Sequence, residues 1–434
     1  MMTTKEVEKL IPKMAIPSMI SMLISCFYNL ADTFFVGKLG NEPAAAIGVV
    51  FSYMNFVQAI GYFYGQGSGT YMSRMLGRQE NEKAGRMMSC GFWYALITAI
   101  LCMLTGLIFA RPLAIVLGSI DSVLPYAVQY LRIISLGAPF TIITCVLNGQ
   151  LRFQGNAMFS MIAIVAGAVL NALLDPVLIF VFGWGLNGAA IATVLAQLIS
   201  FIILLTGAIK MGNLQKSSHW LTWEGWAIKE ITKGGFPTLI RQGLSSVATI
   251  LLNHVAGRFG VTTMVGMSIM QRVMTFANAM LVGFGQGFQT VCGMNYGAKL
   301  YERVKRSFRF SIKWSTLYLL VLSSILWIFA ETISSWFRDD LEVIAISSEA
   351  IRFVCYAFPF NGFIILGNMM LQVCGKSVQA TILSMARQGF FFIPLIFLLP
   401  GFCGIKGLEM TQMVSDFLTF LLSLPFVIKF IRSF

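Results

Sequence analysis

Polar residues stand close together near the end of one long apolar stretch, residues 158–182. Asn171 and Asp175 are four residues apart, so they share one face of a helix, and Pro176 follows directly. Proline lacks an N–H and normally kinks a helix, which would release the carbonyl of Ala172 from its usual partner. A carboxylate, an amide oxygen and a free carbonyl are hard oxygen ligands of the kind that hold a small cation.

Asp32 and Thr193 lie at a depth similar to that of Asp175. Asp32 is four residues before the outer end of the first apolar run, Asp175 about seven before the outer end of the fifth, and Thr193 about five residues into the sixth. At about 1.5 Å per residue, all three lie roughly 6 to 11 Å below the outer boundary of the membrane. They are therefore placed to form one site, where two carboxylates bind a cation or share a proton. The alternative is that Asp175 caps a bent helix and that Asp32 lies at the interface.

The elements that carry these residues are predicted to be transmembrane helices. Of 434 residues, 57% are hydrophobic and 11% are charged, against roughly 25% charged in soluble domains. Apolar runs of about 20 residues, enough to cross the hydrocarbon core as a helix, recur along the whole chain, so a cleaved signal peptide does not explain them. They are continuously apolar, whereas the strands of a membrane barrel alternate between apolar and polar residues. The runs are therefore predicted to be helices and not barrel strands. We predict an all-α integral membrane protein with twelve spans, at roughly 14–36, 49–73, 88–109, 125–147, 158–182, 188–209, 236–257, 264–292, 311–330, 347–372, 380–400 and 407–429.

The basic residues indicate an orientation rather than a nucleic-acid partner. The formal net charge is +13, yet 22 of the 31 Lys and Arg fall on one side of the predicted membrane and five on the other. The positive-inside rule then places both termini in the cytoplasm. The eight cysteines form no C-x-x-C pair and the two histidines lie far apart, so neither a disulfide framework nor a histidine or cysteine metal site is supported.

The chain contains an internal repeat. GQGSGTYMSRMLGRQENEKAGR at 65–86 matches GQGFQTVCGMNYGAKLYERVKR at 285–306 without a gap, so that Gly65 corresponds to Gly285. The same offset relates further residues, and near the end it slips by one, matching Gly188 to Gly407. The further pairs are Lys13 with Lys233, Pro17 with Pro237, Gly40 with Gly260, Arg132 with Arg352, Pro139 with Pro359, Asn148 with Asn368 and Gly155 with Gly375.

This repeat predicts two lobes of six helices each. Six spans return the chain to the same side of the membrane, so the repeats are parallel and related by a pseudo-two-fold axis along the membrane normal. We expect an N-terminal lobe at 1–209, a cytoplasmic linker at 210–235 and a C-terminal lobe at 236–434. Within the linker, WLTWEGWAIKEI predicts a short interfacial helix with Lys229 and Glu230 in water. Two lobes that rock about a central cavity are typical of a transporter.

Other intramembrane polar residues suggest structural roles. Asp416, about nine residues into the last span, is at a depth that suits a pair with Arg272 on the eighth. The 25 methionines are typical of membrane packing, although a polarizable lining also suits promiscuous binding of apolar cations.

These residues carry a resemblance to the multidrug and toxic compound extrusion (MATE) family of secondary transporters, over nearly the whole chain. The segments that resemble it are LADTFFVGKLG at 30–40, the paired GQG stretches, and NALLDPVLIFVFGWGLNGAAIAT at 171–193. The last is the most specific, because it combines an Asn, an Asp-Pro four residues later, a Gly-rich turn and GAAIAT at the start of the next helix.

The resemblance implies an antiporter that expels cationic amphipathic compounds in exchange for H⁺ or Na⁺, without another cofactor and without enzymatic chemistry. It implies that the coupling cation binds Asp32, Asn171, Asp175 and Thr193, which leaves H⁺ and Na⁺ both open. Asn148 and Gln197 are similar to residues of the substrate cavity, which Asp32 and Asp175 would share, and Pro176 is the expected hinge. Span 7 has no acid and span 10 only Glu349 at its edge, so a coupling site in the second lobe is not expected.

Three other functions compete with this interpretation. A lipid-linked oligosaccharide flippase of the same superfamily would need several Arg or Lys for a pyrophosphate, whereas the buried charges of the first lobe are acidic. A polytopic membrane enzyme would need a catalytic cluster near one face, and a channel would show a unitary conductance. We expect lipophilic cations and the lipid bilayer of the cell membrane as partners, no nucleic acid, and a monomer.

Overall fold

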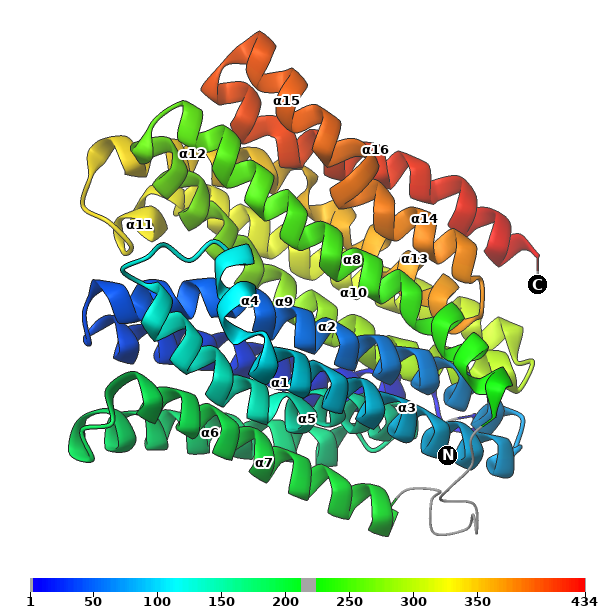
Figure 1. Cartoon of the computed structure of the whole chain (residues 1–434). Coiled ribbons are helices and arrows are strands. Elements are labelled where there is room, and N and C mark those ends of the chain that lie inside the picture. Colours follow the sequence, from blue (N-terminus) through cyan, green and yellow to red (C-terminus); the bar gives the residue numbers. More distant parts are fainter. Residues whose placement is uncertain (1–2, 212–223, 434) are drawn as a thin grey trace. The chain divides into compact units, whose positions relative to one another are not determined.

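The chain is helical almost throughout in the computed structural model, which describes residues 3–211 and 224–433, without the side chains of residues 29–34, 41 and 211. Within these residues there is no β-strand. Figure 1 shows the long helices. Two π-helices, η1 and η4, and one 3₁₀ turn, η3, lie between α-helical segments of the described chain. Their bounds are α1 Val7–Gly37, α2 Asn41–Gly77, α3 Asn81–Ile108, α4 Ala110–Val116, α5 Leu124–Phe153, α6 Ala157–Pro176, η1 Val177–Val181, α7 Gly185–Met211, α8 Gly225–Arg258, α9 Val261–Gly297, α10 Tyr301–Ile328, α11 Ala330–Ser335, α12 Leu341–Ala357, η3 Phe358–Phe360, α13 Asn361–Val373, α14 Ser377–Met385, η4 Ala386–Phe391, α15 Phe392–Cys403 and α16 Ile405–Arg432.

Each of the twelve predicted spans lies in a helical part of the structure. Among the described residues, ten helical segments are long and apolar enough to cross a membrane. The remaining two predicted spans, 236–257 and 264–292, lie within α8 and α9, which are 34 and 37 residues long. Because a helix rises about 1.5 Å per residue, both helices are longer than a hydrocarbon core is thick.

The contacts divide the chain into two compact units that differ from the expected lobes in one respect. The N-terminal unit comprises Ile20–Leu239, and the C-terminal unit comprises Met1–Met19 with Ile240–Phe434. The first part of α1 thus packs with the second half of the chain, and the first part of α8 packs with the first half. The boundaries at Ile20 and Ile240 are related by the same offset that relates Gly65 to Gly285 in the sequence repeat.

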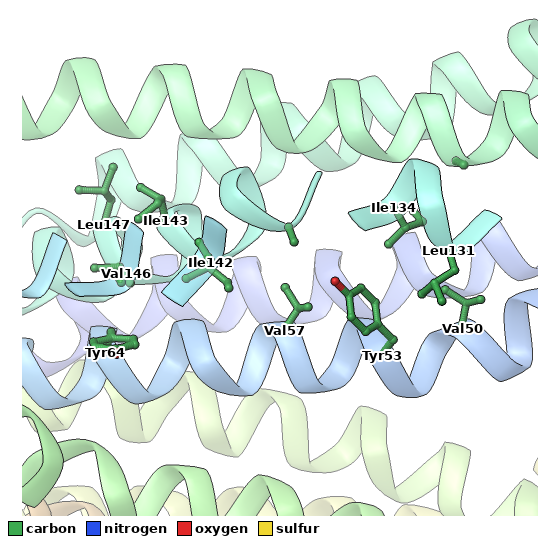
Figure 2. Close-up of a cluster of buried hydrophobic side chains, with 14 of the residues drawn as sticks. Val50, Tyr53, Val57, Tyr64, Leu131, Ile134, Ile142, Ile143, Val146 and Leu147 are labelled. Atoms are coloured by element: carbon green, nitrogen blue, oxygen red, sulfur yellow. The ribbon is translucent and has the colours of Figure 1, made fainter. Parts of the chain in front are cut away.

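A buried apolar seam between α2 and α5 forms the core of the N-terminal unit. Among the described residues, these two helices share the most extensive contact. On α2 the buried residues recur at helical spacing and so make one face, and Figure 2 shows how that face meets α5. The residues in this seam are Val50, Tyr53, Val57 and Tyr64 on α2, and Leu131, Ile134, Ile142, Ile143, Val146 and Leu147 on α5.

The repeated GQG segments are close crossing points of helices. A Cβ on Gly67 would lie 2.3 Å from the carbonyl oxygen of Ile231 on α8, inside the N-terminal unit. A Cβ on Gly287 would lie 2.4 Å from the Cα of Ala15 on α1, inside the C-terminal unit. Glycine is therefore required at both positions because two backbones meet there without room for a side chain.

The predicted interfacial helix is not a separate element where the chain is described. Its first residues lie outside the described part, and its remainder is the first part of α8, from Gly225 onward. That part is fastened to the N-terminal unit: the ring of Trp226 lies 5.3 Å from that of Tyr71, and Arg86 Nη1 lies 3.3 Å from a carboxylate oxygen of Glu224. Glu230 faces Arg74 at 3.6 Å rather than water alone.

Candidate functional site

Three elements of the N-terminal unit, α6, η1 and α7, position the predicted cation ligands. Small residues bring these elements together: a Cβ on Gly167 of α6 would lie 1.9 Å from Ser200 Oγ, and one on Gly188 of α7 would lie 2.6 Å from the carbonyl oxygen of Leu178. Ser200 Oγ also donates to the carbonyl of Ala163 across the same contact, at 3.1 Å. The helices that carry Asn171, Asp175 and Thr193 are thus held at close range.

Asn171, Asp175 and Thr193 meet in the protein interior. They are 0%, 0% and 3% exposed. In the amide orientation that satisfies both ends, Asn171 Nδ2 donates to Asp175 Oδ2 at 3.0 Å and its Oδ1 accepts from the backbone N–H of Thr193 at 3.3 Å. In the other orientation Nδ2 lies 3.4 Å from both Asp175 Oδ1 and Thr193 Oγ1. Either way the amide nitrogen faces the carboxylate, so Asn171 fixes the position of Asp175.

A pocket lies directly beside this cluster and shares Thr193 with it. Its wall includes two neighbouring turns of α7, at Thr193 and Gln197, together with tyrosine rings and further polar groups from α1, α2 and α5. Aromatic faces attract organic cations, and amide and hydroxyl oxygens orient them. The lining residues are Tyr28, Tyr53, Met54, Val57, Gln58, Ile134, Gly137, Ala138, Thr141, Thr193, Val194 and Gln197.

The remaining predicted site residues have different surroundings. Asn148 does not line this pocket: its side-chain oxygen accepts from Ser160 Oγ at 2.6 Å, which joins α5 to α6. Asn368, its repeat counterpart, makes an equivalent link by donating to the carbonyl of Ala380 at 2.7 Å. Asp32 lies within the bounds of α1, but its side chain is outside the described residues.

The helix changes type at the predicted hinge. Pro176 is the last residue of α6, and the chain continues as the π-helix η1, in which the N–H of Phe182 bonds to the carbonyl of Val177. Insertions of π type are rare and frequently accompany functional sites. Here the irregular turn begins at Val177, two residues after Asp175.

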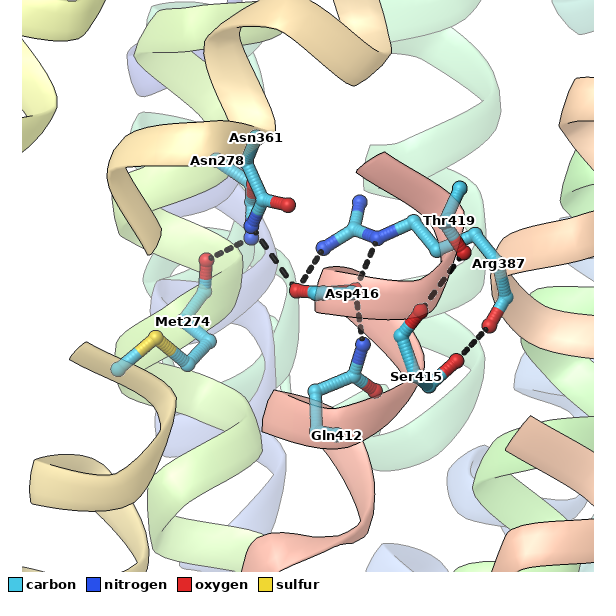
Figure 3. Close-up of polar contacts among 8 residues, drawn as sticks. All are labelled: Met274, Asn278, Asn361, Arg387, Gln412, Ser415, Asp416 and Thr419. Carbon is cyan, nitrogen blue, oxygen red and sulfur yellow. Dashed lines mark hydrogen bonds and ion pairs between the residues drawn. The ribbon is translucent and has the colours of Figure 1, made fainter. Parts of the chain in front are cut away.

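The predicted pair between Asp416 and Arg272 is wrong, because the two side chains have different surroundings. Asp416 is fully buried and accepts from Arg387 at 2.8 and 3.2 Å, whereas Arg272 is exposed. Gln412 and Asn361 also donate to Asp416, at 2.7 and 3.0 Å. Figure 3 shows this cluster, which includes the π-helix η4 that carries Arg387. Arg387 is therefore the counter-ion of this buried carboxylate.

The pocket-lining tyrosines and the neutral polar residues Gln58 and Thr141 are not among the predicted site residues. Uncharged polar residues are common in packed transmembrane helices, so their type alone does not distinguish a pocket wall from a helix interface. A signal was nevertheless present in the repeat, because Gln58 and Thr141 correspond to the polar residues Asn278 and Asn361.

Comparisons with known proteins agree with this architecture. The family model MatE matches residues 17–177 and again 237–398, one match in each half of the chain. The multidrug export protein MepA of Staphylococcus saprophyticus subsp. saprophyticus is 25% identical over 404 residues, covering 93% of this chain and 89% of that protein.

Solved structures share the fold over the full length. A MATE transporter crystallised in complex with MaL6 has a TM-score of 0.94 at 23% identity, covering 100% of this chain and 98% of that one. A superfamily transporter from Pyrococcus furiosus, described as having a binding pocket of reverse polarity, has a TM-score of 0.93 at 22% identity, covering 100% and 97%. The fold is therefore the twelve-helix, two-lobed fold of these transporters. The family matches and the export proteins among its relatives make the protein a multi-pass membrane transporter rather than an enzyme. From the two family matches, which together span most of its length, the chain belongs to the MatE family.

Proposed function

We propose that this protein is a secondary active antiporter that exports cationic amphipathic compounds in exchange for H⁺ or Na⁺. The observation that carries the proposal is the buried cluster of Asn171, Asp175 and Thr193 against a pocket with aromatic and amide groups. The relatives named multidrug export proteins support the same substrate class.

The coupling follows from the cost of burying Asp175. A carboxylate in the hydrocarbon region costs about 2.5–3.5 kcal/mol on insertion scales, so the site favours a bound proton or cation. Desolvation favours a proton, whereas the oxygen of Thr193 beside the carboxylate favours Na⁺. A lipophilic cation and the coupling ion compete for the same negative charge, and this competition makes the exchange obligatory.

The exchange also offsets an electrical cost. Exporting one positive charge against an inside-negative potential of about 100 mV costs about 2.3 kcal/mol. Inward movement of one coupling cation down the same potential releases about the same free energy. In this scheme Asn171 positions the carboxylate, Thr193 belongs to both the ion site and the pocket, and Asp32 supplies the second carboxylate. The irregular turn after Pro176 gives α6 a place to bend when the site changes its occupant. We place the protein in the cell membrane as a monomer with both termini in the cytoplasm.

The test is dye efflux from proteoliposomes that contain the full chain. We expect Asp175→Asn, which keeps the shape of the side chain but removes its charge, to lower gradient-driven efflux of a lipophilic cation by about tenfold or more, since charged hydrogen-bonding partners contribute about 1.5–3 kcal/mol. Asp121→Asn is the matched control, because Asp121 is an exposed acid of the same unit. Asp32→Asn should behave like Asp175→Asn. Undiminished efflux by both Asp175→Asn and Asp32→Asn would refute the assignment of the site.

A further inference from the structure

The carboxylate of Asp416 is fully engaged, but the guanidinium of Arg387 is not. Four hydrogen bonds reach Asp416, two from Arg387 and one each from Gln412 and Asn361. These use Nε and Nη2 of Arg387, and Nη1 makes no hydrogen bond within the described part of the chain. Asp416 is 0% exposed, whereas the side chain of Arg387 is 20% exposed. One edge of the guanidinium is therefore fixed, and the other edge remains open for a ligand.

A second arginine, Arg241, adds a positive charge to this region. Arg241 on α8 belongs to the same unit and lies three residues, about one helical turn, before Leu244. Among residues 3–211 and 224–433 it has no ion pair or hydrogen bond. Its helix packs against η4, where a Cβ on Gly389 would lie 3.0 Å from the side chain of Leu244. Two guanidinium groups and one carboxylate thus leave a net charge of one positive unit within the bundle.

The sequence repeat relates this cluster to the pocket of the N-terminal unit. With the offset of the repeat, and its slip by one near the end, four polar positions of the C-terminal cluster correspond to four pocket-lining residues. Gln58, Thr141, Thr193 and Gln197 correspond to Asn278, Asn361, Gln412 and Asp416. Arg387 itself corresponds to Gly167, where a side chain would collide with Ser200. In the C-terminal unit this position lies on the π-helix at 386–391.

We propose that Arg387 and Arg241 form an anion-accepting subsite of the C-terminal unit, which takes the carboxylate of a zwitterionic amphipathic compound. A guanidinium fork matches a carboxylate with two parallel hydrogen bonds, and Arg387 is already oriented by Asp416. An uncompensated arginine within the membrane is unfavourable, and a bound anion offsets that cost. The subsite rests on the proposed function. It extends the substrates from cationic compounds to cationic compounds that also carry a carboxylate.

The test uses a matched pair of probes, a rhodamine with a free carboxylate and its methyl ester, bound to the purified full chain in phosphatidylcholine nanodiscs. We expect Arg241→Gln to weaken binding of the carboxylate probe by about tenfold and to leave the ester unchanged, because only the acid uses a charged hydrogen bond. The double variant Arg387→Gln/Asp416→Asn, which removes the buried pair without leaving a lone charge, should do the same. Arg272→Gln, at an exposed arginine of the same unit, is the control.

Two outcomes would overturn the subsite: equal weakening of both probes, or no change in the affinity for the acid. A third outcome would also overturn it: phosphatidylglycerol displaces the carboxylate probe from the wild type but not from the variants. The guanidinium groups would then bind a lipid. Failure of the wild type to bind or export the ester would instead contradict the proposed function, so the two claims fail separately.

Discussion

At the scale of single residues, two buried aspartates have opposite surroundings. Asp175 accepts from the neutral amide of Asn171, which orients the carboxylate. Asp416 is paired with Arg387, so its charge is already balanced by the protein. A salt bridge within the protein contributes to structure, whereas a carboxylate oriented by a neutral amide is suited to bind an exchangeable ion.

Breaking the buried pair in the C-terminal unit tests this distinction. We expect Arg387→Gln to destabilise the purified protein by about 3–5 kcal/mol, because the charge of Asp416 is left buried and uncompensated. The double variant Arg387→Gln/Asp416→Asn should be closer to wild type, since no lone charge remains. The measurement is thermal unfolding in detergent. Equal destabilisation in the single and the double variant would mean that Asp416 does not depend on the guanidinium.

At the scale of helices, close crossings and irregular turns surround the functional groups. Gly67 and Gly287 lie at equivalent points of the repeat, and each meets the backbone of a helix that joins the unit from the other half of the chain. The π-helices η1 and η4 adjoin or carry the residues on which the two proposals rest, Asp175 and Arg387.

A methyl group at either crossing should separate the helices. We expect Gly67→Ala and Gly287→Ala each to destabilise the protein by about 1–3 kcal/mol, the usual cost of overpacking, because backbone atoms cannot move aside as a flexible side chain can. Gly243→Ala is the matched control, since a Cβ on this helical glycine meets nothing within 4 Å. There the added helix propensity should be neutral or stabilising by up to about 1 kcal/mol. Equal melting temperatures for Gly67→Ala and Gly243→Ala would show that the crossing tolerates a side chain.

At the scale of the whole molecule, continuous apolar runs specify the twelve helices, and the repeat predicts that the chain divides in two. The cluster of Asn171, Asp175 and Thr193 follows from helical spacing and depth alone. The partner of Asp416 could not be predicted in this way. The depth of a residue along a helix does not say which face of the helix it lies on, and Arg387 lies near the end of a predicted span. The exchange of the first parts of α1 and α8 depends on tertiary contacts that no local pattern records. The lobe boundaries of 1–209 and 236–434 remain a prediction.

The most direct measurement is gradient-driven efflux of a lipophilic cation from proteoliposomes, first with a proton gradient alone and then with a sodium gradient alone. An antiporter whose buried carboxylate exchanges ion for substrate should export the dye with one of these gradients and stop when it is collapsed. With the same gradient, the Asp175→Asn variant should export the dye about tenfold more slowly, or slower still. Efflux at an unchanged rate with both gradients collapsed would contradict the account.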